Sequence, residues 1–194
     1  MNDTALNRED WLQKAAKELD PLLTEAGGPS VEVHVSIGFP SKSSLSLKRR
    51  RIGECWDPSC SNDKKAQIFI SPLLNDPVTV LATLLHEQIH ASVGTKEGHK
   101  GLFRKVAKAS GLEGKMTATV PGEKLTAKLV EISGRLGPLP HPNFDPSLKV
   151  RKVAKTYLLK VECPECGYTI RVTQKWMDMG LPTCACGSEM AVSA

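Results

Sequence analysis

The chain has 194 residues, of which 40% are hydrophobic, and a formal net charge of +5. This length allows one medium domain with an appendage or two small domains, and the composition is that of a chain able to bury a core. The first residues, MNDTALNREDWLQK, are polar and charged, and no apolar run approaches the roughly 18–20 residues of a membrane span. We therefore expect a soluble, intracellular protein with no signal peptide and no membrane contact.

Helices and strands are predicted throughout the first 140 residues. Periodicity and turn residues predict helices over 8–26, 77–93, 99–110 and 121–137, and strands over 31–37, 50–56, 67–72 and 115–120. The second helix has clear end signals, with Asp76 as the N-cap, Pro77 at the first helical position and Gly94 as the stop. This order of elements predicts an α+β fold.

The domain boundary is predicted from a proline-rich stretch. GPLPHPNFDPSLK contains four prolines in 13 residues and leads into a basic segment. We expect one domain over residues 1–140, a proline-rich and basic linker over 141–155, and a small cysteine-containing module over 156–194.

The segment His86-Glu87-Gln88-Ile89-His90 carries the strongest chemical signal. Residues four apart lie one turn apart on the same helix face, so His86 and His90 can bind one zinc ion. Glu87 lies beside them, where it can meet a metal-bound water as a general base. Chance is the alternative explanation for so short a motif.

A catalytic zinc needs a third protein ligand, and His99 is the candidate. It follows His90 by nine residues, and Gly94 and Gly98 allow the chain to turn back between them. On a helix starting near residue 99, His99 would share the buried face with Leu102, Phe103, Val106 and Ala107. We expect His99 to point inward; the alternative is an ordinary core histidine.

Four of the six cysteines lie in the predicted C-terminal module. The candidate ligands are Cys163, Cys166, Cys184 and Cys186. Four thiolates suit a closed, structural zinc site, and the strand-like YTIRVTQKWM between the two pairs indicates a zinc ribbon. Disulfides are the alternative, and the second pair has one intervening residue where two are usual. Cys55 and Cys60 receive no function.

Basic residues indicate a surface for nucleic acid. Between Val33 and Gly53 there are five cations and no acid, and further cations lie on the helix after His99 and around the module. The candidate nucleic-acid contacts are Arg49, Arg50, Arg51, Arg104, Lys152 and Lys175. Such residues would bind phosphates of single- or double-stranded DNA without reading sequence. A solvated surface is the alternative.

The motifs GECW, QIFISP, LLHEQIHA, GHKGLFRKVAKASGL and GPLPH, in this order, resemble the SprT-like (Spartan-like) zinc metallopeptidases of bacteria and their phages. The resemblance covers roughly residues 50–142 and the cysteine tail. It implies a zincin fold, with a small sheet on the helix of His86, and a cytoplasmic location in a bacterium or a phage-infected cell. It also implies cleavage of protein substrates, among them DNA-associated or DNA-crosslinked ones.

Two functions follow from these patterns. The first is a zinc metalloendopeptidase with one catalytic and one structural zinc. The second is a non-catalytic DNA-binding or transcription-associated zinc protein in which the histidine site is structural. Glu87 favours the enzyme, because a structural site has no need of a carboxylate beside a water position.

Overall fold

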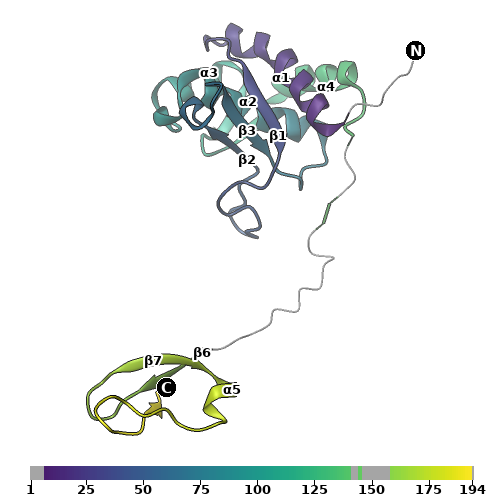
Figure 1. Ribbon diagram of the computed structural model, residues 1–194. Coiled ribbons are helices and arrows are strands. Elements are labelled where there is room, and N and C mark those ends of the chain that lie inside the picture. Colours follow the sequence, from purple (N-terminus) through teal and green to yellow (C-terminus); the bar gives the residue numbers. More distant parts are fainter. Residues whose placement is uncertain (1–6, 141–143, 146–157, 194) are drawn as a thin grey trace. The chain divides into compact units, whose positions relative to one another are not determined.

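The structure is a computed structural model that describes residues 7–140, 144–145 and 158–193. The chain divides into two compact units, Met1–Pro146 and Ser147–Ala194 (Figure 1). The mixed α+β class agrees with the sequence prediction. Of the predicted linker over 141–155, only Phe144 and Asp145 lie within the described residues. None of the helices in the described residues has the length and apolar character needed to cross a membrane.

The first unit combines helices with short strands. Its helices are α1 (Arg8–Glu25), α2 (Pro77–Val93), α3 (Gly101–Ala109) and α4 (Glu123–Leu136), with 3-10 turns at Pro58–Cys60 and Thr95–Glu97. Its strands are β1 (Val33–Ile37), β2 (Gly53–Trp56), β3 (Ala66–Ile70), β4 (Leu112–Lys115) and β5 (Ala118–Pro121).

A three-stranded sheet with the order β1-β3-β2 is the framework of this unit. β1 runs parallel to β3, and β2 runs antiparallel to it with Gly53 opposite Ile70. Side chains alternate along each strand, so that Val33, Val35 and Ile68 are buried on one face. β2 is an edge strand, and this exposes one side of its backbone to the neighbouring site.

Helix α2 lies at the centre of the unit and contacts β2, β3, α1, α3 and α4. It begins as predicted, because the side chain of Asp76 accepts a hydrogen bond from the backbone N–H of Thr79 at 2.8 Å. Five apolar side chains of this helix are completely buried, namely Val80, Leu81, Leu84, Leu85 and Ile89. Each contributes about 1.5–3 kcal/mol of burial free energy, which fixes the helix against the sheet.

Two predicted elements differ from the structure. The helix predicted from residue 99 begins at Gly101, because Lys100 is extended and forms the N-cap. Leu102, placed on the buried face by the sequence pattern, is 42% exposed. The single strand predicted over 115–120 is a hairpin, in which β4 and β5 pair with Lys115 opposite Ala118.

The second unit is small and built around one sheet with the order β7-β6-β8. Its elements are β6 (Leu158–Glu162), β7 (Thr169–Thr173), α5 (Gln174–Met177) and β8 (Ala191–Val192). The strand predicted in YTIRVTQKWM is therefore β7, and its last residues form α5. The buried side chains of this unit are Val161, Cys163, Cys184 and Met190. A core of this size is too small to stabilise the folded unit alone, so most of the stability of the unit must come from another source.

Candidate metal centres

Three imidazoles converge beside α2. His86 and His90 come from this helix, and His99 comes from the turn before α3. The Nε2 atom of His99 lies 3.3 Å from Nε2 of His86 and 3.2 Å from Nε2 of His90. A tetrahedral zinc site with Zn–N bonds of about 2.0–2.1 Å has ligand-to-ligand edges of about 3.3–3.4 Å. These two distances match such edges, and the ligand atoms of all three histidines lie within 4.8 Å of one another, so the group could hold one metal ion.

The turn after α2 brings His99 back to the helix. Gly94 ends α2 with a φ of 93°, and Gly98 has a φ of 57°. Residues other than glycine rarely adopt such backbone angles, so glycine at these two positions allows the chain to reverse its direction. The juxtaposition of His99 with the two helix histidines agrees with the sequence prediction. It is reached from a turn, however, and not from the face of a helix.

A single aromatic ring packs against all three histidines. The Phe103 side chain is fully buried, and its ring centroid lies 5.0, 4.1 and 5.1 Å from those of His86, His90 and His99. Burial, with the charges of neighbouring histidines, lowers the pKa of His86 to about 4 and that of His90 to about 3. Burial and Arg51 lower the pKa of His99 as well. The imidazoles are therefore neutral at physiological pH, with lone pairs free for a metal.

Thr119 on β5 holds His86 from behind. The Nδ1 atom of His86 lies 2.9 Å from the Thr119 hydroxyl oxygen. With Nε2 turned towards the other histidines, Nδ1–H donates to this oxygen, which fixes both the tautomer and the ring orientation. Such an outer partner is typical of metal-binding histidines. Sequence reasoning missed Thr119, because only the folded hairpin brings it to α2.

Glu87 lies in a confined, buried position next to the histidines. Its residue is 7% exposed, and the Cys55 backbone N–H donates a hydrogen bond to its carboxylate. A Cβ atom placed on Gly53 would lie 2.6 Å from Oε1 of Glu87, so the close approach of β2 requires glycine there. Burial raises the pKa of Glu87 to about 8, with a smaller contribution from Glu54. A carboxyl group tuned in this way can accept and release a proton near neutral pH.

These groups line one open cleft of about 600 Å³. It is lined by the three histidines and Glu87, by the edge strand β2, and by residues 117–120 of the hairpin. Arg50 and Arg51 lie at the wall formed by the chain entering β2. Within the described residues the histidine group contains three ligands and no fourth. A tetrahedral ion held by these three ligands would keep one position open for water or a substrate, as in catalytic zinc sites.

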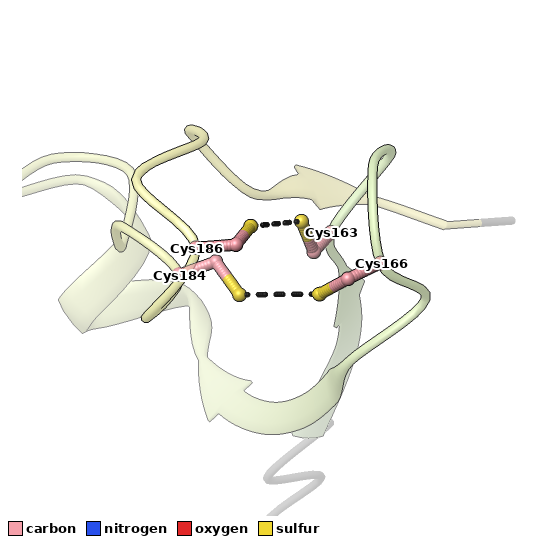
Figure 2. Close-up of side chains that lie close together, drawn as sticks. All are labelled: Cys163, Cys166, Cys184 and Cys186. Atoms are coloured by element: carbon pink, nitrogen blue, oxygen red, sulfur yellow. Dashed lines mark hydrogen bonds between the residues drawn. The ribbon is translucent and has the colours of Figure 1, made fainter.

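A second candidate centre lies in the C-terminal unit. Figure 2 shows the four cysteine side chains pointing towards one another from two loops. Sγ of Cys163 lies 3.5 Å from Sγ of Cys186, and Sγ of Cys166 lies 3.5 Å from Sγ of Cys184. All four sulfurs lie within 4.8 Å of one another, and the thiols are free. Zn–S bonds of about 2.3 Å give tetrahedral edges of about 3.8 Å, so the group could hold one metal ion.

The residues predicted to contact nucleic acid are spread over both units. Arg49 and Arg104 are exposed, and Arg50 and Arg51 belong to the cleft. Lys175 places its Nζ atom 5.1 Å from the centroid of the exposed Trp176 ring, and Lys152 lies outside the described residues. Nucleic-acid binding by these residues stays a prediction.

Cys55 and Cys60, left without a function by the sequence, have different surroundings. Cys60 is exposed in a 3-10 turn, whereas Cys55 lies in β2 and lines the cleft. Burial, and to a lesser degree the charges of Glu87 and Asp57, raises the pKa of the Cys55 thiol to about 12. The thiol is thus protonated and a poor metal ligand.

Comparisons with protein-family models, with curated proteins and with solved structures found no match for this chain. The resemblance to SprT-like metallopeptidases stays a prediction from the motifs.

Proposed function

We propose that this chain is a zinc-dependent metalloendopeptidase of zincin type. One observation carries the proposal: three neutral imidazoles at zinc spacing share an open cleft with a buried glutamate of raised pKa. His86, His90 and His99 would hold the ion. Zinc, when bound, supplies a Lewis acid that activates water and polarises a carbonyl group. The proposed C-terminal ion at the four cysteines is structural, because four thiolates leave no open position.

Glu87 performs the proton transfers in this proposal. Its carboxylate takes a proton from the attacking water and later delivers that proton to the leaving amine. The hydrogen bond from the Cys55 N–H and the contact with Gly53 hold the carboxylate in one orientation. Thr119 holds His86, and Phe103 fixes the three rings. The residues around the site are thus arranged before a substrate arrives.

The free edge of β2 favours a polypeptide substrate. The Ser71 N–H donates to the Ile52 carbonyl at 2.9 Å, so the backbone N–H and C=O groups of even-numbered residues in β2 point towards β3. Gly53 and Cys55 are odd-numbered, and their backbone groups therefore point away from β3 and towards the cleft. The Cys55 N–H is used by Glu87. The remaining groups can pair with an extended peptide as an added strand.

The alternative, a non-catalytic zinc protein, has less support. A structural zinc site usually takes four protein ligands and excludes water. Here a carboxylate of raised pKa lies beside three ligands in a cleft that is open to solvent. The protein substrate, including one associated with DNA, is part of the proposal.

The proposal is tested by metal-dependent peptide hydrolysis. The full-length protein is incubated with a pool of internally quenched peptides and with an unfolded protein, before and after removal of metal by a chelator. We expect cleavage that is lost on chelation and restored by added zinc, with products that map inside the chains. Cleavage that persists unchanged in the fully metal-free protein would refute a zinc peptidase.

A further inference from the structure

Arg51 is held in place at the wall of the cleft by a carboxylate beneath it. Its Nη1 atom lies 2.7 Å from Oε1 of Glu54, whose side chain is only 12% exposed. The same carboxylate accepts hydrogen bonds from Ser41 N at 2.8 Å, Ser41 Oγ at 2.7 Å and Trp56 Nε1 at 3.2 Å. Burial raises the pKa of Glu54, but the hydrogen bonds from Ser41 and Arg51 lower this pKa by more, so it lies below its ordinary value. Arg51 is thus pre-oriented, yet 48% of its side chain remains exposed.

The charges around the cleft do not balance. Among the lining residues, Glu54 is paired with Arg51, and Glu87 is buried at the floor. Arg50 is exposed and forms no ion pair with any residue that the structure describes. A divalent cation at the histidines would add further positive charge. The cleft therefore favours an anionic group on the molecule that enters it.

The rest of the lining indicates which anion fits. None of the described lining residues is Phe, Tyr or Trp, so the cleft offers no ring for unpaired bases to stack on except the histidine rings that would hold the metal. Instead it presents the free edge of β2 on one wall and the exposed side chain of Val120 on the other. Backbone groups and an apolar wall suit a peptide, and guanidinium groups bind carboxylates through paired hydrogen bonds.

We propose that Arg50 and Arg51 make this site selective for polypeptides that carry Asp or Glu close to the cleaved bond. This inference rests on the proposed peptidase function and names its substrate class. Arg51, fixed by Glu54, supplies the oriented donor, and Arg50 supplies the second charge. The same two residues were predicted from sequence to bind phosphates; their position in the cleft assigns them to a carboxylate.

Binding and cleavage of matched peptides test this assignment. Peptides of one sequence carry Glu, Gln or Lys at each of three positions on either side of the cleaved bond. Binding is measured by fluorescence anisotropy with the zinc-loaded Glu87→Gln protein, and cleavage with the wild type. We expect a preference of about tenfold for Glu over Gln at one or two positions. Gln lacks the negative charge, and a hydrogen bond to a charged group strengthens binding by about that factor.

Variants identify the residues responsible. Arg50→Gln and Arg51→Gln should each reduce the preference, and the double variant should remove it. Arg49→Gln, which removes an equal charge outside the lining, should leave it unchanged. Arg50→Glu should shift the preference towards Lys. Because Arg50 is exposed and unpaired among the described residues, its variants test the inference even where loss of Arg51 disturbs the loop around Ser41.

Each outcome separates the two proposals. A preference for Glu in binding, without cleavage by the wild type, keeps the carboxylate site and refutes the peptidase. Cleavage with equal use of Glu and Gln peptides, or a preference that survives in the double variant, overturns the inference. Absence of binding by every Glu peptide overturns it as well. Displacement by a single-stranded oligonucleotide that depends on Arg50 and Arg51, with no peptide preference, would assign these residues to phosphate.

Discussion

Replacing Glu87 by Gln is expected to abolish peptide hydrolysis and, in the metal-free protein, to raise stability above neutral pH. Loss of a general base costs about 10²–10⁴-fold in rate. The amide keeps the shape of the side chain and can still accept the hydrogen bond from the Cys55 N–H, so the histidines and their metal should be retained. Activity close to that of the wild type in a zinc-loaded Glu87→Gln protein would remove Glu87 from the mechanism.

The stability effect has a definite sign. The pKa of Glu87 is raised from 4.5 to about 8 by burial in the folded chain, whereas in the unfolded chain it is ordinary. Between these values the folded state binds the proton more strongly, so the contribution of Glu87 to stability is complete below pH 4.5. It is lost as pH rises to about 8.

A neutral Gln has no such dependence. We therefore expect Glu87→Gln to stabilise the metal-free protein by about 1–3 kcal/mol at pH 8 and by much less at pH 5. Thermal unfolding of the chelated proteins across this pH range measures the difference. Glu113→Gln, at an exposed glutamate of β4, is the matched control and should change neither activity nor this pH dependence. Equal unfolding temperatures for wild type and Glu87→Gln at pH 8 would contradict the burial cost.

The double substitution Cys163→Ser, Cys184→Ser is expected to unfold the C-terminal unit. Both residues are buried, and together with Val161 and Met190 they are its buried hydrophobic residues. Domains below about 40 residues usually need a metal or disulfides to fold. Metal binding at such sites contributes about 10–16 kcal/mol at pH 7, far more than this core can replace.

Nuclear magnetic resonance of the full chain measures this outcome. Amide signals of residues 158–193 should collapse to unfolded positions in the double variant, while those of residues 7–140 stay dispersed. Cys60→Ser, at an exposed cysteine outside the cluster, is the control and should change neither set. Dispersed signals from residues 158–193 in the double variant would show that the unit folds without metal.

Elements with local end signals could be predicted from the sequence. The start of α2 is marked by Asp76 and Pro77, and its end is marked by Gly94. The structure confirms this helix. The alternation in VEVHVSI likewise gave β1, because a half-buried strand leaves a period-two pattern. The grouping of His86, His90 and His99 was also predictable, because the spacing on the helix and two glycines limit where His99 can lie.

Other features depend on contacts between distant segments and leave no local signal. Because Lys100 is extended, α3 begins after it, and His99 lies in a turn and not on a helix face as predicted. Thr119 meets His86 only because the hairpin packs on α2. The ion pair between Glu54 and Arg51 depends on the loop that brings Ser41 to the same carboxylate. This contact leaves no local pattern, so the sequence indicated only a basic segment.

We expect the histidines to hold one metal ion and the cysteines another. Native mass spectrometry of the full-length protein, purified with zinc, counts these ions directly. The wild type should carry two zinc ions per chain, and His99→Ala should carry one, held at the cysteines. Two ions in His99→Ala, or one ion in both proteins, would show that the three histidines are not a metal centre.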